Sequence, residues 1–137
     1  MGSRLFIDTD ILIDFSQDKN NAVETIAELE KEFDFCISVI VAMELYAGCR
    51  SKQELANIES FLSGFEIVFI TTNISKQAFS WMKQFRSSHG VEINDMLIAA
   101  TTVTSNAKFI SKNQKHYRFL PDLNLLEYPW SGIKPAH

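Results

Sequence analysis

The chain has 137 residues, of which 46% are hydrophobic and 22% are charged. This length suits one domain with a sizeable buried core, and this composition excludes an intrinsically disordered chain. The formal net charge of −4 argues against broad, nonspecific binding to nucleic acid, and with no apolar run near 18 residues we expect neither a membrane span nor a signal peptide.

Strands and helices alternate through the first third of the chain. Short apolar runs predict buried strands, and apolar residues at helical spacing opposite a row of acids predict an amphipathic helix. In chain order we expect a strand over residues 4–8, a helix over 10–17, a helix over 21–32 and a strand over 35–37. Thr9 or Asp10 is the expected N-cap of the first helix, because both residue types cap helices well.

Residues that start and stop helices mark the rest of the chain. Ser38 is placed to cap a helix over residues 39–47, which Gly48 ends. The later elements are expected as a helix over 52–63 ended by Gly64, a strand over 65–70, a helix from Thr72 or Asn73 to 88 ended by Gly90, a helix over 94–105, and strands over 108–110 and 123–126.

This order of elements predicts the architecture. Strands that are apolar without a polar alternation, and that are separated by helices, imply a parallel sheet with helices on both faces. We therefore expect one α/β domain over residues 1–137, with about five parallel strands as the middle of three layers. In such folds the functional crevice lies at the carboxyl ends of the strands, where the sequence places Asp8, Glu44 and Asn113.

Three acids are candidates for function, and each also has a structural explanation. Asp8 ends a strand, where an aspartate commonly serves as a turn or cap residue. Asp95 falls in the first turn of a helix, where the helix dipole favours an acid. Glu44 lies in a segment that is apolar on almost every face, with no Lys or Arg within a helical turn. A buried carboxylate there needs a cation, a distant base or a raised pKa.

Together the three acids indicate a metal site. Carboxylates that meet at one edge of a sheet repel one another unless a cation lies between them. Oxygen ligands without His or Cys suit a hard ion, Mg²⁺ or Mn²⁺, and clusters of this kind typically serve phosphoryl or phosphodiester transfer. The sequence thus predicts Asp8, Glu44 and Asp95 as catalytic metal ligands, with an oxygen of Asn113 beside them.

A basic strip follows the fourth strand. Lys108 opens a stretch, ending at residue 121, that contains four Lys or Arg and one His but no acid. Because an acidic site alone repels a phosphate backbone, this strip is placed to hold the substrate's phosphates. The alternative is an ordinary solvated face. The candidates are Lys112, Lys115, Arg118 and, as a weaker one, His116.

Four blocks of the sequence carry a resemblance to a known family. They are LFIDTDILID at residues 5–14, ISVIVAMELYAG at 37–48, NDMLIAAT at 94–101, and ISKNQKHY at 110–117 with Leu120, Pro121 and Leu123 after it. In this order and spacing they resemble the motifs of PIN-domain proteins, especially VapC-like toxins. The blocks cover nearly the whole chain, and their joint occurrence makes the resemblance specific.

The resemblance implies a PIN nuclease fold and a Mg²⁺-dependent endoribonuclease, with Mn²⁺ as a possible substitute. VapC-like members act on tRNA, rRNA or mRNA, are neutralised by a cognate antitoxin and in many cases form a homodimer. The family's acids carry over onto Asp8, Glu44 and Asp95. Two positions depart from the pattern. Asp10 stands where Asn is usual, and it either adds charge to the site or caps the helix. Asn113 stands where many members have Asp, which puts tight binding of a second metal in doubt.

Two surfaces are expected to meet partners. An acidic groove is best blocked by an antitoxin peptide that carries Arg or Lys. The acids Glu24, Glu28 and Glu32 are expected to extend this attraction. Apolar side chains of the peptide are expected to contact Leu12, Phe15 and Tyr46. A homodimer is expected through the helices of residues 52–63 and 73–88, whose Phe61, Phe79, Trp81 and Phe85 exceed what one core face needs.

The two cysteines and Asp14 have no expected role in the site. Cys36 and Cys49 are too far apart for a redox or zinc motif, so we expect reduced cysteines and a cytoplasmic protein. We interpret Asp14 as a surface residue of its helix rather than a ligand.

Three alternatives compete with the nuclease toxin. A receiver-type signalling domain needs a phosphoacceptor aspartate after its third strand, where this chain has Ile70 and Thr71. A PIN-like binding module without catalysis is kept open by Asn113. A PIN nuclease could also serve RNA processing or cleave DNA, and the sequence leaves that open.

Overall fold

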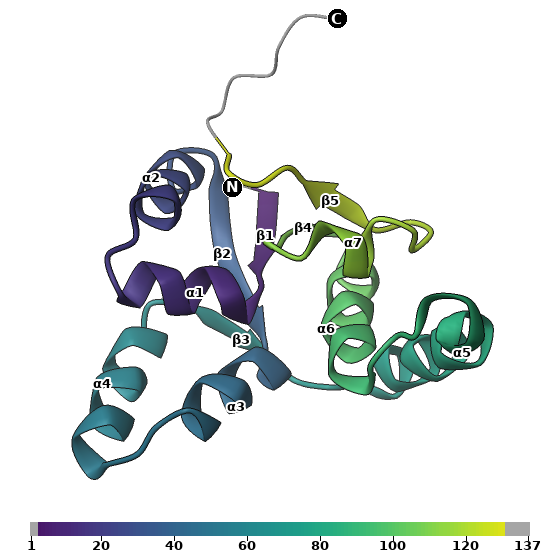
Figure 1. The fold of residues 1–137 in the computed structure, drawn as a ribbon, viewed down its shortest axis with the longest axis horizontal. Coiled ribbons are helices and arrows are strands. Elements are labelled where there is room, and N and C mark those ends of the chain that lie inside the picture. The colour runs from purple at the N-terminus through teal and green to yellow at the C-terminus, as the bar shows by residue number, and fades with distance from the viewer. Residues whose placement is uncertain (1–2, 131–137) are drawn as a thin grey trace, which may run out of the picture.

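The structure is a computed structural model that describes residues 3–130. Within this range seven helices alternate with five strands (Figure 1). In chain order the elements are β1 (Ser3–Ile7), α1 (Thr9–Ser16), α2 (Asn20–Leu29), β2 (Phe33–Ser38), α3 (Val39–Ala47), α4 (Lys52–Leu62), β3 (Glu66–Val68), α5 (Thr72–His89), α6 (Ile93–Thr104), β4 (Lys108–Ile110), α7 (Gln114–Tyr117) and β5 (Asn124–Leu126). The single domain expected over residues 1–137 extends at both ends beyond the described residues. No helix of the described part is long and apolar enough to cross a membrane.

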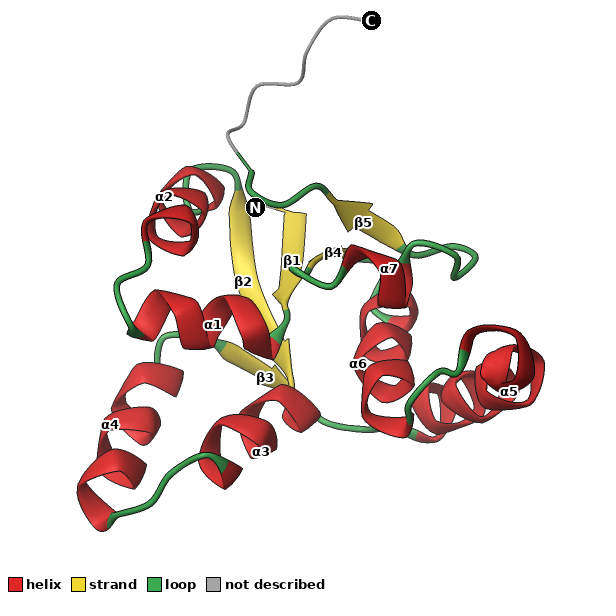
Figure 2. Ribbon diagram, viewed as in Figure 1, coloured by secondary structure: helices red, strands yellow, loops and turns green. Residues whose placement is uncertain are grey.

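All five strands are parallel and form one sheet in the order β3-β2-β1-β4-β5. Figure 2 shows α1 and α2 on one side of the central strands and α5 and α6 on the other. The predicted architecture, a parallel sheet between layers of helices, is confirmed. The chain runs outward from β1 to β2 and β3 and then crosses back to β4. Neighbouring strands β1 and β4 therefore lead their chains to opposite sides, and a crevice is expected between their carboxyl ends.

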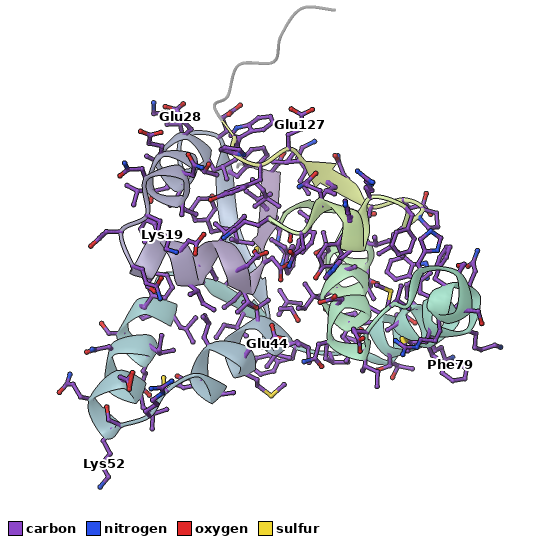
Figure 3. All side chains as sticks on the ribbon, in the orientation of Figure 1. Lys19, Glu28, Glu44, Lys52, Phe79 and Glu127 are labelled. Carbon is purple, nitrogen blue, oxygen red and sulfur yellow. The ribbon has the colours of Figure 1, made fainter. Side chains whose placement is uncertain are left out.

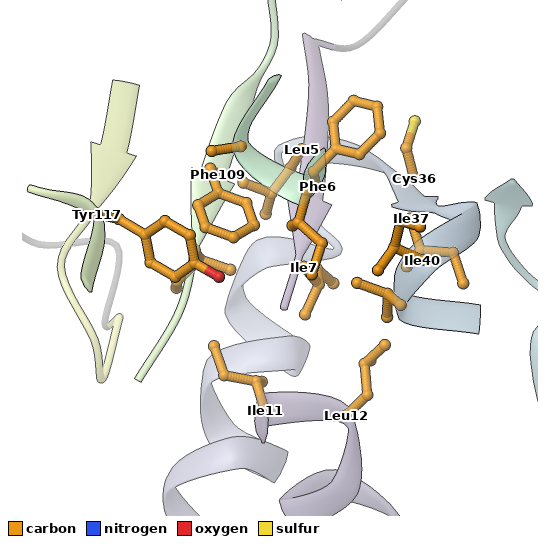
Figure 4. Packing of buried hydrophobic residues seen from close by; sticks show 14 of the residues in the cluster. Leu5, Phe6, Ile7, Ile11, Leu12, Cys36, Ile37, Ile40, Phe109 and Tyr117 are labelled. Carbon is orange, nitrogen blue, oxygen red and sulfur yellow. The ribbon is translucent and has the colours of Figure 1, made fainter. Parts of the chain in front are cut away.

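The central strand is buried on both faces. Leu5, Phe6 and Ile7 of β1 are each at most 1% exposed, as expected for a strand without polar alternation. Figure 4 shows Ile11 and Leu12 of α1 pointing toward this strand. Burial of each such side chain contributes about 1.5–3 kcal/mol, so this packing fixes where β1 ends and where its next residues stand.

Several element ends differ from the prediction. The N-cap of α1 is Asp8, neither Thr9 nor Asp10, because Asp8 has extended backbone (φ −75°, ψ 158°) and its carboxylate accepts from the Thr9 backbone N–H. The helix expected over 21–32 ends at Leu29, since three residues are needed to turn into β2. The short helix α7 was not predicted, because four residues are too few for a helical periodicity to be recognised.

Gly90 ends α5 as predicted, and we expect its replacement by Ala to destabilise the protein. Its φ of +63° lies in the left-handed region, which costs a residue with a Cβ about 1–2 kcal/mol. Gly48 is the matched control, because its φ of −79° is ordinary and an added Cβ would meet its nearest neighbour at 3.6 Å. Chemical unfolding should show Gly90→Ala losing about 1 kcal/mol or more, and Gly48→Ala losing nothing. Equal losses in both variants would contradict this explanation.

Candidate active site

An open cavity of about 320 Å³ lies at the carboxyl edge of the sheet. Its lining contains four carboxylates and one amide side chain from elements far apart in the sequence. The lining residues are Asp8, Thr9, Asp10, Ile13, Glu44, Asp95 and Asn113. The structure thus brings the four residues expected at the site into one cavity and adds Asp10 to them. A larger cavity of about 580 Å³ that includes Arg4 and Lys108 lies at the opposite, amino edge of the sheet and has no comparable cluster.

Asp8 is the most buried of these acids, at 5% exposed. Its Oδ1 accepts from the Thr9 backbone N–H (2.9 Å), and its Oδ2 accepts from the Ser111 hydroxyl (2.7 Å). Burial, and after it the negative charge of Asp10, raise the pKa of Asp8 to about 7, against the pull of those two hydrogen bonds. A carboxylate in this position is an unfavourable charge that a cation would stabilise.

Asp10 lies beside Asp8 and is half-buried. Its Oδ1 accepts from the Ile11 backbone N–H (2.7 Å), and Ser111 Oγ lies 3.5 Å from its Oδ2. Burial raises the pKa of Asp10 as well. The sequence left open whether Asp10 caps the helix or joins the site. The cap is Asp8, and the Asp10 carboxylate lines the cavity.

Glu44 reaches the same cavity from α3, and Figure 3 shows it between α3 and α6, where β1 and β2 end. Its Oε1 accepts from the Thr9 hydroxyl (2.5 Å) and its Oε2 from the Asn94 amide (3.2 Å). Among the described residues no Lys or Arg forms an ion pair with it. The expected burial of α3 was wrong in part: Met43 is 51% exposed and Glu44 only half-buried, because one side of this helix faces solvent.

Asp95 stands in the first turn of α6. Its Oδ1 accepts from the Tyr117 hydroxyl (3.1 Å), and Nδ1 of His116 lies 3.4 Å from its Oδ2. Burial raises the pKa of Asp95, the bonds from Tyr117 and His116 oppose that shift, and the charge of Glu44 adds to it. The Tyr117 side chain is buried at 1% exposed, so its hydroxyl is fixed in place.

Sequence reasoning missed the neutral groups that orient these acids. They are Thr9, Asn94, Ser111 and Tyr117. Ser111 alone had a signal in the sequence, because it directly follows β4 at the predicted functional edge. It also accepts from the backbone N–H of Asn113 (3.0 Å), which leaves the exposed Asn113 side chain at the cavity.

The predicted basic strip does not act as one surface. Lys108 begins β4, at the amino edge of the sheet, away from the acids. Lys112 forms an ion pair with Asp14, which is 9% exposed, so the interpretation of Asp14 as a surface residue was wrong. Lys115 is exposed near Asp95, with His116 next to it, and Arg118 caps the carboxyl end of α7.

The donor chemistry of the cavity fits a hard divalent cation, because every candidate ligand atom is a carboxylate or amide oxygen. Within residues 3–130, however, no three His, Cys, Asp or Glu side chains are arranged to hold a metal between them. Mg²⁺ usually keeps several waters and takes only one or two protein carboxylates. The cavity therefore suits an ion held partly through water.

Comparisons with known proteins agree over most of the chain. The family model described as "PIN domain" matches residues 5–119, a range that includes every residue lining the acidic cavity. The chain is 34% identical over 119 residues to "Ribonuclease VapC19" of Mycobacterium tuberculosis, covering 85% of this chain and 94% of that protein. It is 30% identical over 128 residues to "Ribonuclease VapC1" of Methanocaldococcus jannaschii, covering 92% of this chain and 88% of that protein.

Solved structures share the fold. The chain superimposes with a TM-score of 0.74 and 25% identity on VapBC2 from Rickettsia felis bound to a promoter DNA fragment, covering 90% of this chain and 97% of that one. It matches VapBC-1 from nontypeable Haemophilus influenzae with a TM-score of 0.77, 21% identity and the same coverage. The second likeness is one of fold alone.

Proposed function

Because this chain belongs to the PIN domain family, we propose that it is a divalent-cation-dependent endoribonuclease and the toxin of a toxin–antitoxin pair. One observation carries the proposal. Carboxylates from α1 and its cap, from α3 and from α6 line a single cavity at the functional edge of the sheet. Relatives at 30–34% identity are named VapC ribonucleases, and the solved structure that matches at 25% identity is VapBC2 bound to promoter DNA.

We propose Mg²⁺, or Mn²⁺ in its place, as the cofactor. Asp8, Glu44 and Asp95 would hold it, in part through bound water, with Asn113 as a neutral oxygen donor and Asp10 as added negative charge. When bound, such an ion lowers the pKa of a water and stabilises charge on the phosphodiester transition state. The raised pKa of Asp8 supports a cation here, because it reflects charges that burial and a neighbouring acid leave unbalanced.

The chain's own residues hold the acids in position for this chemistry. The Thr9 hydroxyl occupies one oxygen of Glu44, and the Ser111 hydroxyl and the Thr9 N–H fix both oxygens of Asp8. The Tyr117 hydroxyl holds Asp95 from the buried side. Carboxylates fixed in this way keep their geometry when substrate binds. Such preorganisation raises the rate of the reaction, because the groups need no reorientation in the transition state.

For the substrate we propose RNA phosphates held by Lys115, His116 and Arg118. Lys112, which the sequence grouped with them, is engaged by Asp14 and contributes less.

An antitoxin groove is proposed beside the active site. A cavity of about 450 Å³ between α1, α3 and α4 has apolar walls that include Ile13, Leu45 and Ile58. Glu44 and Ile13 line both this cavity and the acidic one, so a bound segment could reach the carboxylates with a Lys or Arg. Leu12 cannot receive an anchor as expected, because it is 1% exposed.

The homodimer stays a proposal, but for most of the aromatic residues expected at its interface the prediction was wrong. Trp81 is buried, Phe61 packs against Phe15 and Phe65, and Phe85 packs against Phe119. These aromatics are used within one chain. The exposed apolar side chains on and beside α3, α5 and α6 include Met43, Phe69, Phe79 and Ile93, and these four are the surface we propose for a second copy.

Expression in a bacterial host tests the toxin role. Growth should stop with the wild type, continue with Asp95→Asn, and recover when the cognate antitoxin is co-expressed, because a basic antitoxin segment would fill the groove. Equal protein levels of wild type and variant, measured by immunoblot, are the control. Growth arrest by both the wild type and Asp95→Asn would mean that the toxicity does not depend on the Asp95 carboxylate. Harmless wild-type expression together with RNA cleavage by the purified enzyme would favour an RNA-processing nuclease.

A further inference from the structure

A second, smaller cavity of about 150 Å³ adjoins the acidic one. Residues from the end of α5, the start of α6, and α7 with the turn after it line it, among them His89, Asp95, Lys115, His116 and Phe119. Asp95 lines both cavities, so a ligand in the acidic one can extend into its neighbour. Pockets for whole small molecules start near 300 Å³. This one is therefore suited to a single ring or a phosphate.

One wall of the small cavity is aromatic. The His89 ring stacks on Phe119 with centroids 3.9 Å apart and planes 17° from parallel, and Phe85 meets both rings edge-on. His89 is exposed and lines the cavity, so part of its ring is accessible to a ligand. A His in the last turn of a helix is also favoured by the helix dipole. The helix dipole explains why a His is favoured at position 89. It does not explain the stacking on Phe119, which gives a flat aromatic surface beside the active site.

The turn that closes the cavity is held rigidly. Arg86 donates to the carbonyl oxygens of Gly90 (3.1 Å) and Val91 (2.8 Å) and forms an ion pair with Glu92. Gly90 provides the left-handed residue that the turn requires. The aromatic wall is therefore attached to a fixed backbone and needs no ordering when a ligand arrives.

A cation completes the cavity. Lys115 forms no hydrogen bond or ion pair with any residue of the described range 3–130, whereas Lys112 is occupied by Asp14. An aromatic face and a free ammonium group are the two groups that proteins use for single-stranded nucleic acid, the ring for a base and the cation for a phosphate.

We propose that this cavity is a nucleotide subsite, in which one base of single-stranded RNA stacks on His89 while Lys115 contacts its phosphate. The proposal rests on the proposed ribonuclease function and adds to it a substrate requirement. Stacking uses the face of a base and not its hydrogen-bonding edge, so the subsite accepts all four bases. The subsite does require an unpaired nucleotide. This is the nucleotide that lies next to the cleaved bond, on the side where Asp95 connects the two cavities.

The test uses five single-stranded RNA pentamers, each with the fluorescent base 2-aminopurine at a different position, because stacking quenches its fluorescence. They are titrated, with Mg²⁺, into the Asp8→Asn protein to prevent cleavage. At least one probe should be quenched. Adding His89→Ala to this protein should remove the quenching and weaken RNA binding about tenfold. Adding His89→Phe instead should preserve the quenching and the binding affinity. Lys115→Ala should weaken binding without removing the quenching at saturation, and Lys52→Ala, at the far end of α4 (Figure 3), should change neither.

The outcomes separate the subsite from the nuclease. His89 is exposed, so its variants should fold, and a thermal melt of each checks this. If the wild type cleaves RNA but no probe is quenched, or if Ala and Phe at position 89 act alike, the subsite is wrong and the nuclease stands. If quenching follows His89 but the wild type cleaves nothing, the subsite stands as an RNA-binding site without the proposed catalysis. No cleavage and no binding would overturn both.

Discussion

The Asp8→Asn and Asp95→Asn proteins are expected to cleave RNA at least about a hundredfold more slowly than the wild type. Each substitution keeps the volume of the side chain and removes a charge from the proposed cation site. Loss of a correctly placed cation removes several kcal/mol of transition-state stabilisation, and each 1.36 kcal/mol is tenfold in rate. The measurement is a time course of cleavage with Mg²⁺ at matched protein concentrations.

Asp34→Asn is the matched control for these variants. Asp34 is exposed on β2, away from the carboxyl edge of the sheet, so its charge should not affect the rate. A rate for Asp8→Asn or Asp95→Asn within a few-fold of the Asp34→Asn rate would remove that acid from the catalytic site.

Without a divalent cation, the wild-type protein should become less stable as the pH rises. The pKa of Asp8 is raised by burial and by Asp10 from an ordinary 3.8 to about 7 in the folded protein. The folded state then binds a proton that the unfolded state has released. This contribution to stability is complete below pH 3.8 and is lost as the pH rises through about 7. Over that window it amounts to at most about 4 kcal/mol, and the raised pKa values of Asp10 and Asp95 act in the same direction.

Urea unfolding in EDTA at pH 5, 6, 7 and 8 measures this effect. The Asp8→Asn protein should show a weaker pH dependence and be the more stable protein at pH 8, since Asn caps a helix about as well as Asp. Added Mg²⁺ should stabilise the wild type at pH 8 more than the variant. A metal-free wild type that gains stability from pH 6 to pH 8 would contradict the electrostatic account of the cavity.

Local patterns in the sequence were enough to predict the sheet and the acids. β1 and β4 are short, end in apolar residues and are each followed directly by a polar residue, so a parallel sheet and its functional edge could be predicted. Glu44 was selected because it lacked a nearby base, and that reasoning holds although α3 is less buried than expected. The resemblance to PIN-domain proteins, now supported by the match over residues 5–119, added the family.

Pairs distant in the sequence could not be predicted. The ion pair between Asp14 and Lys112 joins residues 98 positions apart, so no periodicity or spacing indicates it, and it removed one base from the predicted strip. The aromatic wall joins His89 to Phe119 across α6 and β4. Tertiary packing decides such contacts. The surplus of aromatic residues in the helices of residues 52–63 and 73–88 had instead suggested that Phe85 and Trp81 served a dimer.

The most direct test of the central claim is incubation of the purified wild-type protein with total cellular RNA, with Mg²⁺ in one sample and EDTA in another. The Asp95→Asn protein in Mg²⁺ controls for contaminating nucleases. We predict discrete RNA fragments with the wild type in Mg²⁺, and intact RNA both in EDTA and with Asp95→Asn. Intact RNA in all samples, or cleavage that persists in EDTA and in the variant, would contradict the assignment of a metal-dependent ribonuclease to this cavity.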